Sequence, residues 1–259
     1  MSNLKYFISY IRGFRTVLHS FVLVVLTAGF LMVVSGCEQS PPESISETGF
    51  ALGTTCSVKL YGSEYSTYLE PALEIASEIE AQMSTHTEDS EVAEINRSAG
   101  RNAAAVSEET FQLIRRAKKF SALSEGIFDL TVGPLVELWD IGSGEERVPS
   151  QEALAAALTK VDFRNVQLKE AAANQSERPQ VFLQHEGMRI DLGAIAKGYA
   201  ADRIVEYLRS KGVEYGIVNL GGNVYAFGEK HNASKWKIGI QSPTDERGRY
   251  IGIVELVDK

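Results

Sequence analysis

The sequence contains little cysteine and no excess of positive charge, and each shortage excludes a class of protein. Only two cysteines, Cys37 and Cys56, occur among the 259 residues. A fold held together by a disulfide framework is therefore excluded, apart from a single bridge between these two. The formal net charge is −8 at pH 7. Nucleic acid is therefore a poor candidate partner, because phosphate backbones bind basic proteins.

A Walker A loop and an internal repeat are also missing. That loop needs Lys followed by Ser or Thr, whereas Lys197 is followed by Gly198. The remaining composition is that of an ordinary globular protein, with 44% hydrophobic and 23% charged residues. A chain of this length is large enough for one generous domain or two small ones.

The N-terminal end has the pattern of an export signal. Lys5, Arg12 and Arg15 precede an apolar run over 17–34 that ends just before Cys37. Small residues directly before a cysteine resemble the lipobox of bacterial lipoproteins, which implies cleavage before Cys37 and its acylation. An uncleaved transmembrane helix is the alternative. Both interpretations place the rest of the chain on the periplasmic side of the inner membrane.

The sequence after this signal divides into a short tether and one domain. We expect residues 1–36 to be a signal peptide, 37–48 a tether and 49–259 the domain. The tether prediction rests on a polar composition with two adjacent prolines and several serines.

The hydrophobic pattern of the domain predicts both helices and strands. Apolar residues at helical spacing predict helices over 68–83, 89–96, 107–120 and 150–158. The expected caps are Asp89 or Ser90 for the second helix, Ser107 for the third and Ser150 for the fourth. β-favouring runs predict strands over 55–61, 163–168, 181–184, 215–220, 224–227, 236–240 and 250–256. The segment 126–135 is expected to be extended. Short connections favour antiparallel pairing, so the predicted fold class is α+β, with antiparallel sheets and packed helices.

The stretch 189–203 is a candidate ligand site. It predicts a short strand ending at Asp191, a tight turn at Gly193 and a helix with Lys197 in its first turns. The free N–H groups and positive dipole end of a helix start suit a phosphate, and a lysine adds a mobile charge. A carboxylate can hold a metal ion or a ligand hydroxyl. An ordinary strand-to-helix turn with a surface lysine is the alternative.

Four blocks of sequence together resemble the ApbE-type FAD:protein FMN transferases. They are Met83-Ser84-Thr85 with 89–91 and Asn96, then 128–139, then 191–202, and then 218–223. The blocks follow the order of the family from about Gly53 to about Ser242. The resemblance implies the family's T-fold-like variant of an α+β fold.

The resemblance also implies an activity. Members of this family bind FAD with Mg²⁺, split its pyrophosphate, transfer FMN to a Thr or Ser hydroxyl of a target protein and release AMP. The implied partners are FAD and the flavin-acceptor subunits of Nqr- or Rnf-type redox complexes. Such transfer depends on charge neutralisation and positioning. A periplasmic FAD pyrophosphatase and a non-catalytic flavin-binding lipoprotein are the alternatives.

Motif positions imply which residues contact the cofactor. The expected FAD contacts are Leu52, His86, Ile127, Phe128, Asp129, Asp191 and Lys197. Leu52 stands where the family usually has Met, and His86 where it usually has an aromatic residue. Both changes are expected to alter affinity more than chemistry. Ala194 matches the position whose backbone carbonyl meets Mg²⁺. A core aromatic is the alternative for Phe128, and a satisfied loop histidine is the alternative for His86.

The family pattern continues past the strand predicted over 250–256, with blocks that complete the metal shell. The resemblance therefore implies that the remaining Mg²⁺ ligands lie beyond residue 259 and that the chain is a C-terminally truncated copy. We expect such a chain to supply only part of the metal site and to be inactive or unstable by itself.

Overall fold

A computed structural model describes residues 42–141, 144–171, 177–230, 234–244 and 248–256. The predicted signal peptide and Cys37 lie outside these residues. Within the described part, no helix combines the length and apolar character needed to cross a membrane. Export and lipidation therefore stay predictions.

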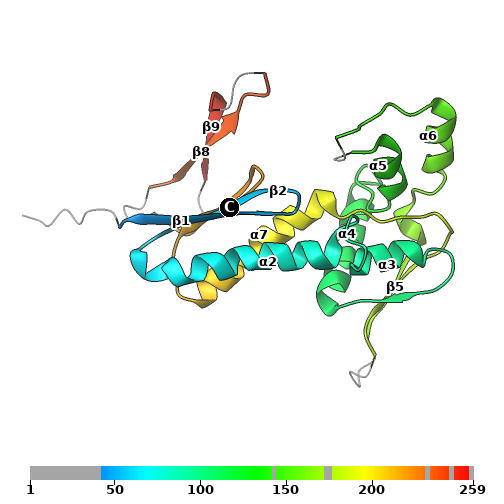
Figure 1. Cartoon of the computed structure of the whole chain (residues 1–259), viewed down its shortest axis with the longest axis horizontal. Coiled ribbons are helices and arrows are strands. Elements are labelled where there is room, and N and C mark those ends of the chain that lie inside the picture. The colour runs from blue at the N-terminus through cyan, green and yellow to red at the C-terminus, as the bar shows by residue number, and fades with distance from the viewer. Residues whose placement is uncertain (1–41, 142–143, 172–176, 231–233, 245–247, 257–259) are drawn as a thin grey trace, which may run out of the picture. The chain divides into compact units, whose positions relative to one another are not determined.

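A four-stranded antiparallel sheet, in the order β1-β2-β6-β7, forms the centre of the fold (Figure 1). Its strands are β1 (Ser44–Ala51), β2 (Thr54–Tyr61), β6 (Gly216–Leu220) and β7 (Asn223–Phe227). Alternate residues of β2 and β6 are buried, as expected for strands with one face against a core. Val58 and Val218 are directly paired, and both are fully buried. The antiparallel hairpin predicted around Gly221 is confirmed.

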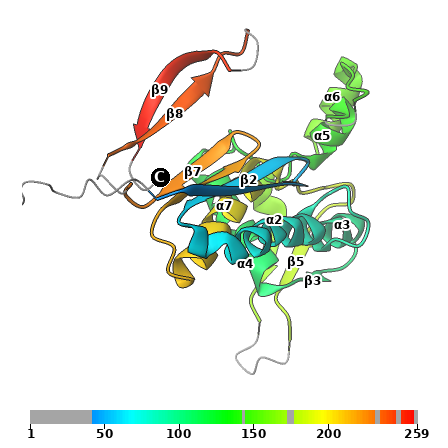
Figure 2. The same cartoon turned by 60° about the vertical axis from the view of Figure 1, so that its left-hand side comes forward.

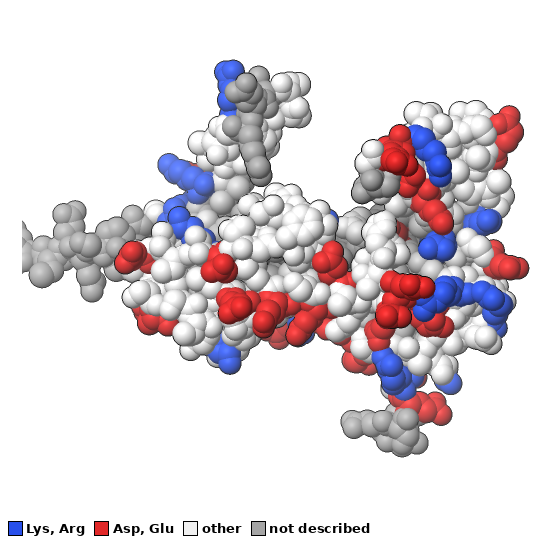
Figure 3. All heavy atoms as spheres, viewed as in Figure 1, with Lys and Arg blue, Asp and Glu red and all other residues white. Residues whose placement is uncertain are grey.

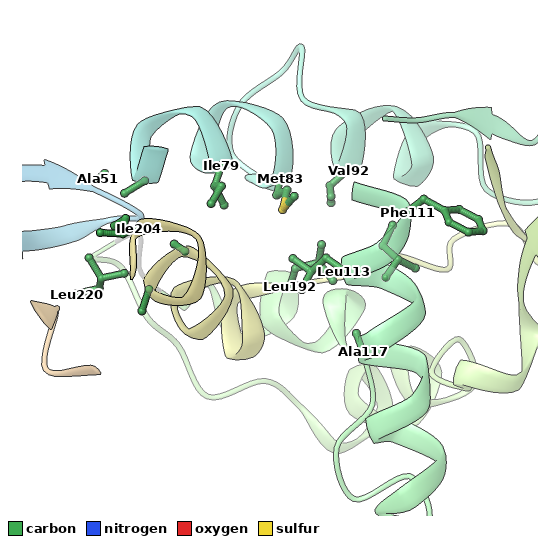
Figure 4. Packing of buried hydrophobic residues seen from close by; sticks show 14 of the residues in the cluster. Ala51, Ile79, Met83, Val92, Phe111, Leu113, Ala117, Leu192, Ile204 and Leu220 are labelled. Atoms are coloured by element: carbon green, nitrogen blue, oxygen red, sulfur yellow. The ribbon is translucent and has the colours of Figure 1, made fainter. Parts of the chain in front are cut away.

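Two long helices, α2 (Leu69–Met83) and α7 (Gly193–Ser210), cover one face of this sheet (Figures 1 and 2). Figure 4 shows Ile79 and Met83 of α2 pointing into the interior that also holds Leu192 and Ile204. The opposite side of α2 is acidic and exposed, and Figure 3 shows Asp and Glu atoms gathered along this helix. This division of apolar and charged faces is what the helical spacing of the sequence predicts.

The remaining elements lie around the central sheet and its two helices. Four of them are the helices α3 (Glu91–Arg97), α4 (Glu108–Leu123), α5 (Gly133–Trp139) and α6 (Gln151–Leu158), and two are the short helices η1 (Ser63–Tyr68) and η2 (Phe163–Asn165). A second sheet consists of β3 (Ala104–Ala105), β5 (Gln180–Leu183) and β4 (Val166–Lys169), in that order. The strands β8 (Trp236–Gln241) and β9 (Tyr250–Leu256) form a separate hairpin. All strand pairs within these sheets are antiparallel. The predicted α+β class is therefore confirmed.

Serine caps set the starts of three helices, as the sequence predicts. The hydroxyl oxygens of Ser90, Ser107 and Ser150 accept hydrogen bonds from the N–H groups three residues later, at 2.9, 3.2 and 3.2 Å. Each bond satisfies a backbone donor that the helix leaves unpaired, which typically contributes about 1 kcal/mol.

The predicted tether is wrong over residues 44–48, because β1 already begins at Ser44. β1 is an edge strand, and most of its side chains are exposed, so it lacks the apolar alternation by which strands are recognised. It is joined to β2 by a two-residue turn in which Leu52 and Gly53 both have positive φ, at 53° and 67°. This is the φ pattern of a type I′ hairpin.

Two further local predictions are wrong. The segment 126–135 is not extended: it forms turns, and α5 begins at Gly133. Pro134 favours this start, because the first turn of a helix does not need its missing N–H. Gly193 is the first residue of α7 rather than a tight turn, and Arg189 forms only an isolated bridge in place of a strand.

Glu91 of α3 joins three segments through its carboxylate. It accepts hydrogen bonds from the N–H and the hydroxyl of Ser107, at 2.8 and 2.7 Å, and it pairs with Arg178. Burial raises the pKa of Glu91, but hydrogen bonds from Thr110 and Ser107 and the charge of Arg178 outweigh it, so the net pKa lies below 4.5.

This lowered pKa predicts how stability depends on pH. The folded chain binds the Glu91 proton less readily than the unfolded chain does, so the carboxylate stabilises the fold above about pH 4.5. That contribution disappears as the pH falls through the folded pKa. Urea unfolding of wild type and Glu91→Gln should differ most at neutral pH and converge below pH 4.5. A difference that stays constant with pH would contradict the assignment.

Candidate functional site

The segment that leads into α7 lies beside the loop that follows α4. The N–H of Asp191 donates to the carbonyl of Leu130 at 2.9 Å, and Arg189 forms a parallel bridge with Val132. Two of the motifs found in the sequence, far apart along the chain, are therefore adjacent in space. The turn at Asp191 faces the loop that contains Asp129, as a shared site requires.

The start of α7 is open to solvent. Gly193 and Ala194 are exposed, and the carboxylate of Asp191 accepts the N–H of Gly193 at 2.7 Å. The N–H of Ala194 has no acceptor within the described residues. This end of an 18-residue helix therefore offers a free donor and a positive dipole end, which together suit an anion.

Asn96 of α3 holds the residue before Asp191 in place. Its side-chain amide donates to the carbonyl of Ile190 at 3.0 Å and accepts the N–H of Ile190 at 2.7 Å. Both residues are buried, with Asn96 only 6% exposed. The sequence motif includes Asn96, but no role is predicted for it. The one signal is its position four residues after buried Val92, which places an amide on the apolar face of a short helix.

Lys197 lies on the side of α7 that faces the end of the central sheet. It is half-buried and close enough to Cys56 to influence that thiol electrostatically. Burial raises the pKa of Cys56, Glu80 raises it further, and Lys197 lowers it. Cys56 is buried and donates to the carbonyl of Ala51 at 3.3 Å. Cys56 is therefore a small residue of the core.

The turn that contains Leu52 lies at the same end of the sheet. Leu52 is partly buried against the core, and the next residue, Gly53, donates its N–H to the carboxylate of Glu80 at 3.1 Å. Glu80 and Lys197 thus both approach Cys56, from α2 and α7. Glu80 is a site neighbour that the sequence does not single out.

His86 is exposed just beyond the C-terminal end of α2. Its backbone N–H donates to the hydroxyl of Ser84 at 3.0 Å. Within the described residues, no hydrogen bond or ion pair joins His86 or Leu52 to Asp191, Lys197 or the segment 127–129. Direct contact among all the predicted residues is therefore not established by the chain alone.

The segment 127–129 presents three different environments. Ile127 is 93% exposed, whereas Phe128 packs against the core. The carboxylate of Asp129 accepts two bonds from Thr131, each 2.7 Å, and one from the N–H of Phe163 at 3.0 Å. Asp129 therefore stabilises its own loop, and a ligand would use the remaining acceptor capacity of its two oxygens.

The described residues do not form a complete magnesium site. No group of three or more His, Cys, Asp or Glu side chains in this part of the chain could hold a metal ion. The carbonyl of Ala194 belongs to the first turn of α7, and magnesium requires near-octahedral oxygen coordination.

Comparison with known proteins identifies the family. A sequence model described as the ApbE family matches residues 52–259. A FAD:protein FMN transferase of Klebsiella pneumoniae is 37% identical over 211 residues, and one of Treponema pallidum is 35% identical over 210 residues. These alignments cover 82% and 76% of this chain, but only 63% and 58% of the two relatives, so the chain spans less than two thirds of their length.

Solved structures agree in fold. The crystal structure of the ApbE protein of Thermotoga maritima superposes with a TM-score of 0.74 at 33% identity, over 83% of this chain and 68% of that one. The flavin transferase ApbE of Vibrio cholerae superposes with a TM-score of 0.71 at 30% identity, over 84% and 70% of the two chains. On sequence and architecture together, this chain belongs to the ApbE family.

Proposed function

We propose that this chain binds FAD and transfers its FMN part to a Thr or Ser hydroxyl of a target protein. The acceptor oxygen forms a bond to the phosphorus of the FMN phosphate, and the bond from that phosphorus to the bridging oxygen breaks. The hydroxyl proton passes to water, and AMP leaves with the bridging oxygen. The observation that carries this proposal is the 2.9 Å hydrogen bond between Asp191 and Leu130, because it brings two family motifs to one exposed turn.

In this proposal the chain contributes positioning and charge. The diphosphate lies at the start of α7, where the N–H of Ala194 donates to it and the ammonium group of Lys197 offsets its charge. The carboxylate of Asp191 orients the turn through Gly193 and leaves acceptor capacity for a ligand hydroxyl. Leu52 and Ile127 supply apolar surface for the flavin rings.

The proposal also includes a bound magnesium ion, to which no reaction step is assigned. When bound, it would neutralise phosphate charge, and the carbonyl of Ala194 is the ligand expected from this chain. Since the described residues supply no complete shell, the metal dependence needs a direct measurement.

The proposed setting is the periplasmic side of the inner membrane. Acylation at Cys37 would anchor the chain there, with flavin-acceptor subunits of Nqr- or Rnf-type complexes as its targets.

The activity can be tested with FAD in the presence and absence of a purified acceptor domain from an Nqr-type subunit. Covalent flavin on the acceptor, seen as in-gel fluorescence together with one AMP per flavin attached, would support the proposal and contradict the expectation that this chain is inactive by itself. Release of FMN and AMP without acceptor would favour the pyrophosphatase alternative. FAD binding without any cleavage would favour the non-catalytic alternative, and absence of FAD binding would exclude all three.

Lys197→Ala should weaken FAD binding about tenfold, which corresponds to about 1.4 kcal/mol for one lost charged contact. Titration of FAD followed by tryptophan quenching measures the dissociation constant. Lys211→Ala, at the opposite end of the same helix, is the matched control and should leave the affinity unchanged. Equal affinities for wild type and Lys197→Ala would remove the lysine from the phosphate site.

A further inference from the structure

A groove of about 750 Å³ lies between α4 and α7. It is lined by Arg115, Arg116, Lys119, Phe120 and Leu123 of α4 and by Tyr199 and other residues of α7. Neither the sequence motifs nor the proposed transfer reaction assigns a role to this surface.

The groove and Lys197 lie on different faces of α7. Ile195, Tyr199 and Asp202 are three to four residues apart, so they share one face of the helix. Lys197 lies two residues from both Ile195 and Tyr199, so it points away from that face. We therefore expect a molecule in the groove to leave Lys197 accessible to its own ligand.

Three cations of α4 line the groove in a chain whose net charge is −8. Arg115 pairs with Glu170 at 3.0 Å and Arg116 with Asp202 at 3.5 Å, both between exposed side chains. Such exposed pairs contribute little and can be exchanged for a partner's carboxylates. Lys119 has no ion pair in the described part of the chain.

Apolar side chains accompany these cations. Phe120 is 49% exposed and Leu123 is 69% exposed, although both belong to a helix whose opposite face is fully buried. The floor is fixed, because the hydroxyl of Tyr199 donates to Glu109 at 2.8 Å. The groove thus combines a rigid floor with exposed apolar and basic side chains.

We propose that this groove docks an acidic amphipathic segment of a protein partner. The high exposure of its apolar side chains argues against a small ligand, which needs a site that encloses most of its surface. A membrane surface is less suited, because basic clusters that bind anionic lipid usually contain four to eight cations, and here Glu109 and Asp202 lie among three. Carboxylates of the segment pair with Arg115 and Lys119, and its apolar face covers Phe120 and Leu123.

The test uses the full chain and a fluorescein-labelled helical peptide with leucines on one face and glutamates on the other, followed by anisotropy. We expect the peptide to bind and its affinity to fall with added salt. The double variant Arg115→Glu and Lys119→Glu should weaken the affinity for the peptide about tenfold. Phe120→Ala combined with Leu123→Ala should also weaken it. The matched control is Lys235→Glu combined with Lys237→Glu, which reverses two exposed charges on and beside β8 and should change nothing.

Three results would overturn the proposal. They are failure of the wild type to bind the acidic peptide, equal binding of a peptide with lysines in place of the glutamates, and displacement of the peptide by FAD. Vesicles of phosphatidylserine and phosphatidylcholine form a separate arm, and sedimentation that depends on Arg115 and Lys119 would assign the surface to membrane instead. Since no arm requires flavin transfer, loss of the transferase proposal leaves this test intact.

Discussion

Asn96→Leu should lower the free energy of unfolding by about 2–4 kcal/mol and weaken FAD binding as well. The leucine side chain has the same number and branching of heavy atoms but cannot pair with Ile190, whose buried N–H and carbonyl then lose the bonds of 2.7 and 3.0 Å. Each buried group left without a partner costs about 1–3 kcal/mol. The segment before Asp191 is released, and the start of α7 is no longer held against the loop at Leu130.

Urea unfolding followed by far-UV circular dichroism measures the first effect, and FAD titration measures the second. Asn102→Leu is the matched control, because Asn102 is exposed and its side chain makes no hydrogen bond to described residues. Asn96→Asp tests whether a polar side chain is enough without the full pair of hydrogen bonds. The aspartate keeps the acceptor for the N–H of Ile190, but it loses the donor to the carbonyl of Ile190 and buries a charge. If Asn96→Leu and Asn96→Asp both had a free energy of unfolding within about 0.5 kcal/mol of wild type, Asn96 would not hold this segment.

Trp236→Ala should destabilise the chain by about 3–5 kcal/mol, the usual cost of removing a buried aromatic side chain. Trp236 is 2% exposed and packs with the rings of Tyr61 and Tyr215, at centroid distances of 5.9 and 6.5 Å. Its indole N–H donates to the carbonyl of Gly228 at 2.8 Å. Trp236 thereby packs the β8–β9 hairpin against the end of the central sheet, so we expect the hairpin to detach first.

Hydrogen exchange followed by mass spectrometry distinguishes local unfolding of the hairpin from global unfolding of the chain. Peptides over 234–256 should lose protection in Trp236→Ala at urea concentrations where β2 is still protected. Trp236→Phe keeps the ring packing but removes the N–H donor, and it should cost about 1 kcal/mol. Uniform loss of protection over the whole chain would show that the aromatic cluster belongs to the main cooperative unit.

The sequence predicts those parts of the fold whose cause is local. Helices with apolar residues at helical spacing and a serine cap are found where expected, as are strands such as β2 that alternate in burial. Elements determined by distant partners are missed. β1 is polar because it is an edge strand, and the turns after α4 depend on Asp129 accepting a bond from Phe163, 34 positions away.

The candidate site follows the same division. Asp191 and Lys197 are predicted through a motif that is continuous in sequence, and the N–H of Asp191 contacts Leu130 of a second motif. The role of Asn96 is not predictable, because its partner Ile190 lies 94 positions away. The groove is also missed, since the basic residues of α4 look like an ordinary solvated face until α7 is placed beside them.

The hairpin between β1 and β2 has a consequence for how this chain can change over evolution. Leucine with a φ of 53° costs about 1–2 kcal/mol relative to a residue that accepts the left-handed conformation. Glycine or asparagine would relieve that backbone strain, but neither would replace the apolar contacts that the partly buried Leu52 makes with the core. Substitutions at position 52 therefore exchange backbone strain against apolar burial, so few residue types can improve both at once.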